Sequence, residues 1–155
     1  MILIPILFNV QNPPNWNIQE CIVRDINIPA LVCPLEIIHC PYPYIMDTEC
    51  KLKYKNIMAQ LCTDVSQIYD TECNQLIAQY NQEAGIITNS LLNCYLSSTT
   101  PTQSQLCFDQ HCQKAKQLYQ QYSLSISRIK EIYERCIDEE LINIAREAKQ
   151  ECCDL

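Results

Sequence analysis

Apolar residues recur at intervals of three and four along the chain after residue 44. This spacing places them on one face of a helix, because an α-helix has 3.6 residues per turn. The first of these residues are Ile45, Met46, Ile57, Met58, Leu61, Val65, Ile68, Tyr69, Leu76, Ile77 and Tyr80. Asp64 and Gln67 have the spacing of a capping box, which predicts that a new helix begins there. Gly85 predicts a helix end, and a further short helix is expected over residues 86–96.

A second helical stripe follows a loop rich in hydroxyl side chains, residues 97–102. Thr100, Pro101 and Gln103 predict an N-cap, a first helical residue and a capping-box partner. The apolar positions that follow are Leu106, Ala115, Tyr119, Tyr122, Ile126, Ile129, Tyr133, Cys136, Leu141, Ile144 and Ala148. Three serines within residues 123–127 compete for backbone hydrogen bonds, so we expect two helices with a break there. One very long helix is the alternative.

The first 43 residues have a different pattern. Seven of the eight prolines lie there, and this density forbids long helices and favours extended segments. Apolar stretches at residues 2–10 and 26–38 cannot bury themselves. We therefore expect an extended proline-rich N-terminal segment over residues 1–43, which lies as a strap over the helices or over a partner. A disulfide-linked helical domain is expected over residues 44–155.

Composition favours an all-α fold, built of disulfide-stapled helical hairpins or a small bundle. The chain has one glycine, whereas a β-rich fold of 155 residues normally needs several at turns with positive φ. The net charge is −7, and the eleven basic residues are scattered apart from the run at residues 51–55. Nucleic-acid binding is therefore not expected. The apolar opening, residues 1–8, is far too short to span a bilayer, so we expect no transmembrane helix and a peripheral protein.

Cysteine is the residue type that most narrows the class of protein. Twelve cysteines in 155 residues approach the density of disulfide scaffolds, and the count is even. We therefore expect a scaffold of disulfides in an oxidising compartment rather than reduced thiols in the cytosol. The residues concerned are Cys21, Cys33, Cys40, Cys50, Cys62, Cys73, Cys94, Cys107, Cys112, Cys136, Cys152 and Cys153.

The spacing of four cysteines suggests a specific pairing. Nine residues separate Cys40 from Cys50, and ten separate Cys62 from Cys73. Two antiparallel helices marked in this way can be joined by Cys50–Cys62 and Cys40–Cys73, because the position sums of these pairs, 112 and 113, nearly agree. A rival hairpin that turns near Cys62 would pair Cys50 with Cys73 and leave Cys40 to the strap. The pairing of the other eight cysteines stays open, including that of the adjacent Cys152 and Cys153.

In these residues the chain resembles the coiled-coil-helix–coiled-coil-helix family, the twin CX9C proteins of the mitochondrial intermembrane space. The matching pattern is Cys40-x9-Cys50 followed by Cys62-x10-Cys73, similar to that of a small peripheral subunit of cytochrome c oxidase. It covers less than a quarter of the chain. Prolines directly after Cys40 and the helical character of residues 51–61 depart from the family pattern.

Catalytic and metal chemistry find little support in the sequence. There is no C-x-x-C or C-x-C motif for thiol redox catalysis, and no G-x-S-x-G or H-E-x-x-H motif for hydrolysis. Cys107, His111 and Cys112 form a weak candidate for three metal ligands, but disulfides compete for both sulfurs. The alternative for His111 is an ordinary surface histidine beside two bridged cysteines. We therefore expect no enzyme, no metal and no cofactor.

These observations predict an architectural role. The opening of the chain lacks the features of a secretory or matrix-targeting leader, and its first basic residue is Arg24. Together with the twin spacing, this predicts a non-catalytic accessory subunit of a mitochondrial respiratory-chain complex, on the intermembrane-space side of the inner membrane. Its partners would be other protein subunits of that large membrane complex. The alternative is a secreted, disulfide-rich helical binding protein, such as a pheromone, an effector or an extracellular structural unit.

Overall fold

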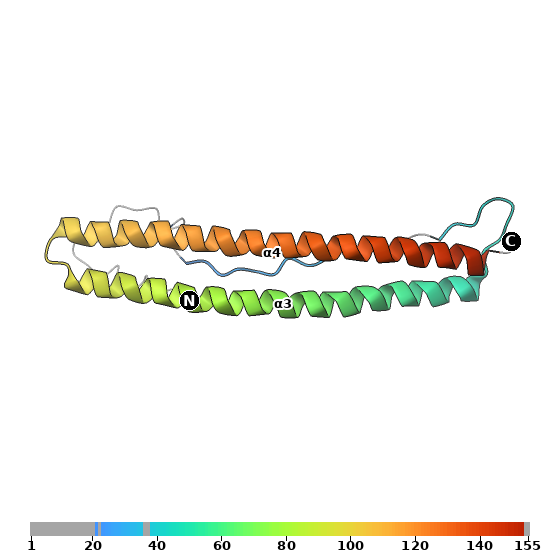
Figure 1. Ribbon diagram of the computed structural model, residues 1–155, viewed down its shortest axis with the longest axis horizontal. Helices are drawn as coiled ribbons and strands as arrows, with labels where there is room; N and C mark the ends of the chain where they lie inside the picture. The colour runs from blue at the N-terminus through green and yellow to red at the C-terminus, as the bar shows by residue number, and fades with distance from the viewer. Residues whose placement is uncertain (1–20, 22, 36–37, 154–155) are drawn as a thin grey trace. The chain divides into compact units, whose positions relative to one another are not determined.

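The computed structural model describes residues 21, 23–35 and 38–153, and two long α-helices make up most of them. Helix α3 spans Thr48–Ser97 and has 50 residues, and helix α4 spans Pro101–Cys152 and has 52 residues (Figure 1). Apart from one isolated bridge between Met46 and Cys153, the described residues contain no β-structure. The predicted all-α fold of disulfide-stapled helices is confirmed.

The contacts of the chain divide it into two units. Unit 1 contains residues 1–28 and 73–126, and unit 2 contains residues 29–72 and 127–155. Each unit combines a piece of the N-terminal segment with an antiparallel pair of helical pieces, one from α3 and one from α4. Both dividing points therefore fall inside the helices.

Helix α3 continues through the two positions where a break was predicted. Gly85 is helical and its φ is not positive, so it does not end the helix. Asp64 accepts a hydrogen bond of 2.8 Å from the Gln60 side chain one turn earlier, which makes it an exposed residue of the helix surface rather than a cap. The prediction of a separate short helix over residues 86–96 was wrong for the same reason. Ala84 and Leu91 are buried on either side of Gly85, and their packing holds this segment helical.

Helix α4 also continues through its predicted break at residues 123–127. The Ser125 hydroxyl donates a hydrogen bond of 3.0 Å to the carbonyl oxygen of Gln121, one turn earlier. The serine hydroxyl therefore forms its hydrogen bond within the helix and does not compete with the backbone hydrogen bonds. Tyr122 and Ile126 are buried on both sides of it. The expected pair of helices was wrong, and the alternative of one very long helix is right.

The predicted start of α4 is confirmed. Pro101 is the first residue of the helix, and the Thr100 hydroxyl accepts a hydrogen bond of 3.2 Å from the Gln103 N–H. The Gln103 side chain returns to accept the N–H of Thr99 at 2.8 Å, one residue before the position that a capping box uses.

The core of unit 1 consists of apolar side chains from α3, α4 and the N-terminal segment. Its largest cluster contains Val23, Tyr80, Ala84, Ala115, Leu118 and Tyr122. The rings of Tyr80 and Tyr122 meet edge to face at 5.5 Å between centroids. Arg24 lies over the Tyr119 ring at 4.2 Å, and this contact holds the N-terminal segment against α4.

Unit 2 has a separate core of the same kind. The cluster contains Ile38, Tyr54, Met58, Ile137, Leu141, Ala148 and Cys152. The side chain of Tyr69 meets that of Tyr133 edge to face at 5.8 Å. Glu134 of α4 accepts a hydrogen bond of 3.1 Å from the Val32 N–H, so a backbone donor of the N-terminal segment is satisfied by a helix side chain.

The predicted strap is present among the described residues. Residues 23–35 contain no helix or strand, and their side chains and carbonyl groups contact α3 and α4. Val23 and Ile38 are buried in the cores of units 1 and 2, respectively. Of the two predicted positions, over the helices or over a partner, the described part of the strap takes the first. The apolar stretch of residues 2–10 lies outside the described residues.

Candidate functional site

Five disulfides form the main chemical feature of the structure. Three join the strap to a helix or to the residue after it: Cys21–Cys112 in unit 1, and Cys33–Cys62 and Cys40–Cys153 in unit 2. Two join α3 to α4: Cys94–Cys107 in unit 1 and Cys50–Cys152 in unit 2. Each unit therefore has a bridge between its helices and at least one bridge to the strap. Cys136 is an exposed thiol on α4.

The predicted disulfide pairs do not form. Cys40 and Cys50 are bonded to the adjacent cysteines at the end of α4, and Cys62 is bonded to Cys33 in the strap. The predicted turn between Cys50 and Cys62 is the interior of α3, where a step of twelve positions places their two Cα atoms about 18 Å apart. A disulfide needs a Cα–Cα distance below about 7 Å. The rival pairing of Cys50 with Cys73 fails for the same reason, since both lie in α3.

A signal for two of the observed pairs was present in the sequence. Residues that pair between two antiparallel helices have nearly the same position sum, and the bridges between α3 and α4, one in each unit, have sums of 202 and 201. The position sums of the predicted pairs, 112 and 113, also nearly agree, and this agreement favoured the wrong pairing. The adjacent cysteines Cys152 and Cys153 do not bond to each other, because each turns to a different element.

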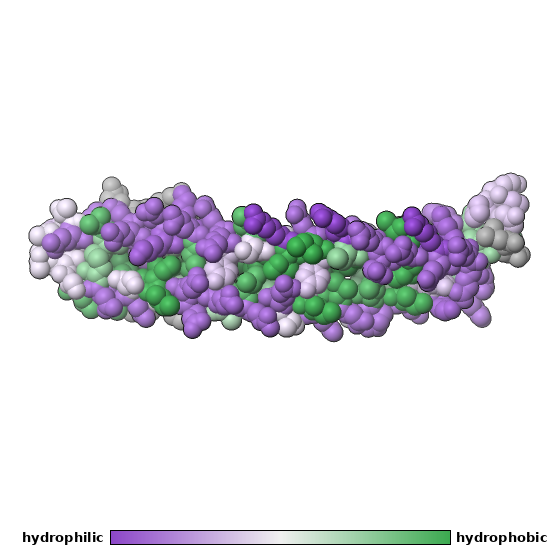
Figure 2. All heavy atoms as spheres, viewed as in Figure 1, coloured by the Kyte–Doolittle hydropathy of each residue, from purple (hydrophilic) through white to green (hydrophobic). Residues whose placement is uncertain are grey.

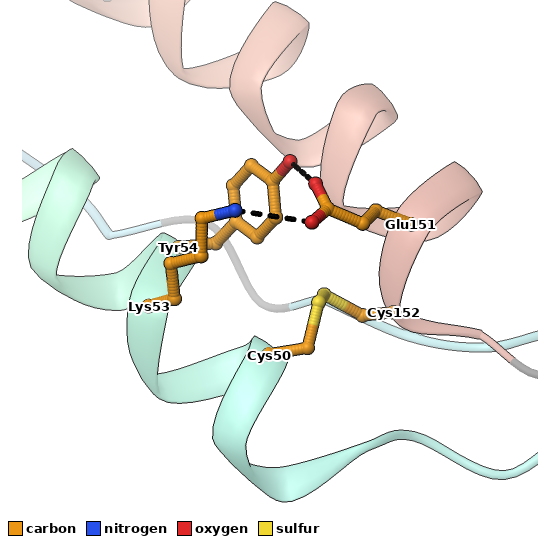
Figure 3. A network of polar contacts seen from close by, with 5 residues as sticks. All are labelled: Cys50, Lys53, Tyr54, Glu151 and Cys152. Carbon is orange, nitrogen blue, oxygen red and sulfur yellow. Dashed lines mark hydrogen bonds and ion pairs between the residues drawn. A yellow bond between two sulfur atoms is a disulfide. The ribbon is translucent and has the colours of Figure 1, made fainter.

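These adjacent cysteines form a clasp in unit 2, which we define as the Cys50–Cys152 and Cys40–Cys153 bridges with Tyr54 and Glu151. In Figure 3 the Glu151 carboxylate reaches from α4 to the Tyr54 hydroxyl and the Lys53 ammonium on α3, next to the Cys50–Cys152 bridge. The ion pair between Lys53 and Glu151 measures 3.0 Å.

A backbone hydrogen bond closes the clasp. The Asp47 N–H donates to the carbonyl oxygen of Cys152 at 3.0 Å, so the start of α3 satisfies a carbonyl at the end of α4. The N–H groups of a first helical turn and the carbonyls of a last turn have no partners inside their own helices. The clasp therefore joins the ends of two helices by covalent, ionic and backbone contacts.

The electrostatics of the clasp keep its two central groups in different protonation states. The hydrogen bond to Glu151, with burial as the second cause, raises the pKa of Tyr54 to about 12. The same hydrogen bond, with that from Lys53, lowers the pKa of Glu151 below its ordinary value. The phenol is therefore neutral and the carboxylate ionised over the whole physiological range, which is the state that holds the contact together.

The candidate metal ligands are not available as a set. Cys107 is bonded to Cys94 and Cys112 to Cys21, so neither sulfur is a thiolate. The described part of the chain contains no other group of three histidine, cysteine or acidic side chains that could hold a metal ion. The weak metal candidate in the sequence is therefore corrected to a site of two structural disulfides.

His111 lies between these two disulfides and is not the surface histidine that the sequence suggested. Its side chain is buried, with 3% of its surface exposed. The backbone of Ile87 on α3 and that of Cys21 in the strap face its ring. Burial lowers the pKa of His111, despite these two groups, so the ring is neutral at physiological pH.

Asp138, Glu139 and Glu140 form an acidic run that is exposed on the surface of α4. The basic run at residues 51–55 lies in the first turns of α3.

Comparison with protein-family models, with curated proteins and with solved structures finds no match for the chain. Among the described residues, no helix combines the length and the apolar character that crossing a membrane requires. The class of protein therefore rests on the fold and its bridges: an all-α chain whose two long helices and strap are cross-linked by disulfides.

Proposed function

We propose that this chain is a non-catalytic structural protein of an oxidising compartment, and that it acts by holding a rigid helical surface against another protein. The observation that carries the proposal is the placement of the five disulfides, which staple helix to helix and strap to helix in both units. Such bridges persist in oxidising compartments and are rare in the reduced cytosol.

The physical advantage of this architecture is a surface that is ordered before it binds. Each bridge stabilises the folded chain by roughly 2–4 kcal/mol, chiefly through the unfolded state. A surface that is already rigid loses less conformational entropy on association, so more of the contact energy appears as affinity. Large apolar side chains remain exposed on both helices and offer contact area to a partner, among them Leu52, Ile68, Ile86, Leu106 and Ile132.

Within this class, our first candidate is an accessory subunit of a mitochondrial respiratory-chain complex on the intermembrane-space side. It is supported by the cysteine content, by the acidic net charge of −7 and by the spacing shared with the twin CX9C proteins. The twin hairpin of that family does not form here, so the resemblance supports the compartment through spacing alone.

The second candidate is a secreted helical binding protein. A specific observation favours it: three of the bridges join residues 91 to 113 positions apart, which is the pattern of a whole-chain scaffold rather than of a small hairpin motif. The two candidates share the proposed binding role and differ in compartment.

The test is the location and assembly state of an epitope-tagged chain in its source cells. The first candidate predicts protease protection inside mitochondria and co-migration with an inner-membrane complex on a native gel after mild detergent. The second predicts recovery from the medium. A chain that is found only as a soluble monomer, in either place, would contradict the binding role itself.

An independent check concerns the bridges. The native protein from its compartment should have a mass lower by about 10 Da than the reduced protein, two hydrogens for each of five bridges. A fully reduced native protein would exclude an oxidising compartment.

A further inference from the structure

One stretch of unit 1, around the loop between α3 and α4, carries no charge in the sequence. Between Glu83 on α3 and Asp109 on α4, residues 84–108 include no Asp, Glu, Lys, Arg or His, although 19% of the chain is charged. In Figure 2 this end of the helices shows pale and green atoms among purple, hydrophilic ones. Charge depletion of this kind is the compositional signature of the buried centre of a protein–protein interface.

Three hollows lie in a row along this part of unit 1. The largest, of about 460 Å³, and the second, of about 300 Å³, share Leu106 in their walls. The second and the third, of about 70 Å³, share Gln110 and the Cys94–Cys107 bridge. Neighbouring hollows share lining residues, and we call the three together the tip groove.

The centre of the tip groove is apolar. Leu106 is 56% exposed and separates the two larger hollows. Pro101 lines the hollow at the loop, and Leu91 lines the one farthest from it. An exposed leucine between two hollows offers apolar contact on both of its sides to a side chain that enters from outside.

The two serine hydroxyls in the walls of the middle hollow are already used within the chain. Ser97 donates to the carbonyl oxygen of Asn93 at 2.9 Å, and Ser98 donates to that of Cys94 at 2.8 Å. Covering these hydroxyls with an apolar surface therefore leaves no donor without an acceptor. Loss of hydrogen bonds to water, the usual cost of burying such groups, is small here.

The walls of the tip groove are held rigid. The Cys94–Cys107 bridge crosses from α3 to α4 within the walls of two of the hollows, with a Cα–Cα distance of 5.8 Å. Behind it, Phe108 is buried and its ring meets that of Tyr95 edge to face at 5.7 Å. The shape of the groove is thus fixed before any partner arrives, which favours specific docking.

We propose that the tip groove is the docking site for an uncharged segment of another protein, with an apolar side chain that packs beside Leu106. This inference rests on the proposed binding function and names the surface that performs it. The charged side chains in the walls of the tip groove lie at its two ends, Asp109 at the largest hollow and Lys114 at the smallest. The middle hollow beside Leu106 has none, so a charged segment seated there would be desolvated with no opposite charge to compensate it. A lipid surface fits less well, because the side-chain amides of Gln103, Gln105 and Gln110 lie around the groove and are costly to place in hydrocarbon.

The test compares two exposed leucines of α4, both in unit 1. Leu106 lies in the tip groove, and Leu124 lies outside it with 52% of its surface exposed. Epitope-tagged wild type, Leu106→Asp and Leu124→Asp are expressed in the source cells, and the fraction of each chain in the high-mass assembly is measured on a native gel. We expect at least a tenfold loss for Leu106→Asp and a wild-type fraction for Leu124→Asp. Leu106→Met should retain assembly.

The fold of each variant is checked by its urea midpoint and by the mass of its five bridges, and Leu106→Gln replaces the aspartate variant if that variant does not fold. Assembly of both Leu106 variants at the wild-type level would overturn the inference and leave the proposed function standing. Equal loss in the Leu124 variant would overturn it as well. Absence of the wild type from any assembly would instead contradict the proposed function and the inference together.

Two other occupants are outcomes of the same test. Binding of the purified protein to phosphatidylcholine vesicles, lost in Leu106→Asp, would assign the groove to lipid and overturn the inference. A concentration-dependent dimer in sedimentation experiments, lost in the same variant, would assign it to a second copy of the chain with the same consequence.

Discussion

The hydroxyl of Tyr69 on α3 donates a hydrogen bond of 2.7 Å to the carbonyl oxygen of Pro29 in the strap. In unit 1, Tyr80 makes the same kind of bond to the carbonyl oxygen of Arg24 at 2.5 Å. The two tyrosines are eleven positions apart in α3, Tyr69 in unit 2 and Tyr80 in unit 1. Both hold the strap through its backbone. These two bonds therefore do not depend on the side chains at positions 24 and 29 of the strap.

Loss of one such hydroxyl should destabilise the chain modestly. Tyr80→Phe keeps the ring that meets Tyr122 and removes the bond to Arg24, so we expect a loss of about 0.5–1.5 kcal/mol in the free energy of unfolding. Urea denaturation of the oxidised protein measures it. Tyr42→Phe is the control, because Tyr42 is 97% exposed and its variant should unfold like the wild type. Equal stability of the Tyr80 variant and the wild type would contradict a bond that holds the strap.

Two adjacent residues of α4 test which face of the helix is buried in unit 2. Leu141 is fully buried, whereas Ile142 is 44% exposed. Leu141→Ala should cost about 2–5 kcal/mol, because it leaves a cavity against Met58 and Ile137. Ile142→Ala should cost much less in the same urea experiment. The reverse order would mean that α4 is rotated relative to the core of unit 2.

The cap of α4 can be tested with a pair of threonines. Thr100→Ala removes the acceptor of the Gln103 N–H and should cost about 1 kcal/mol. Thr102→Ala changes an exposed residue inside the first turn and should change stability by much less. Thermal or urea unfolding measures both. Equal effects of the two substitutions would show that the cap does not stabilise the helix.

The two bridges between α3 and α4 should stabilise their units to a similar degree. Cys50 and Cys152 are 102 positions apart, but the neighbouring Cys40–Cys153 bridge shortens the loop that they close to about a dozen residues. Cys94 and Cys107 are 13 positions apart. Paired alanine substitutions at either bridge should therefore each cost about 3 kcal/mol, the value for loops of this length. A much larger cost for Cys50→Ala with Cys152→Ala would contradict the shortened loop.

The buried His111 should make unit 1 sensitive to acid. Its pKa is lowered by burial, so below pH 6.5 the unfolded chain takes up a proton that the folded chain does not. The free energy of unfolding should therefore fall as the pH is lowered from 7 to 5. His111→Gln should flatten this dependence.

An exposed residue that does not titrate provides the control for that experiment. Leu124 of unit 1 is 52% exposed, so Leu124→Gln should leave the pH dependence as it is in the wild type. Urea midpoints measured at several pH values compare the three proteins. An unchanged slope in His111→Gln would mean that another group causes the acid sensitivity.

The features that were predicted correctly from the sequence are those that depend on residues close together in the chain. The helical face with a period of three to four residues and the Thr100–Pro101 start of α4 depend only on neighbours in the chain, and both are confirmed. Gly85 and the serines at residues 123–127 are local signals too, but the helix breaks that they predicted do not occur. At both places buried side chains on either side, such as Leu91 and Ile126, supply packing energy that exceeds the local preference for a break.

The site could not be predicted because it depends on long-range register. The spacing of Cys40, Cys50, Cys62 and Cys73 fits a short hairpin, and only the unbroken length of α3 excludes it. The burial of His111 is likewise a consequence of three segments that meet, α3, α4 and the strap. Neither the disulfide pairing nor the burial of His111 can be recognised from a stretch of sequence as short as one helix.

The loop at residues 98–100 connects α3 to α4. Every bridge except Cys33–Cys62 joins a residue before this loop in the sequence to a residue after it. A protease that cut the chain there would produce two polypeptides that remain a single covalent body, because four disulfides would still link them. Cleavage would become visible only after reduction. The integrity of this protein therefore depends on its sulfur bonds more than on the continuity of its peptide chain at the turn.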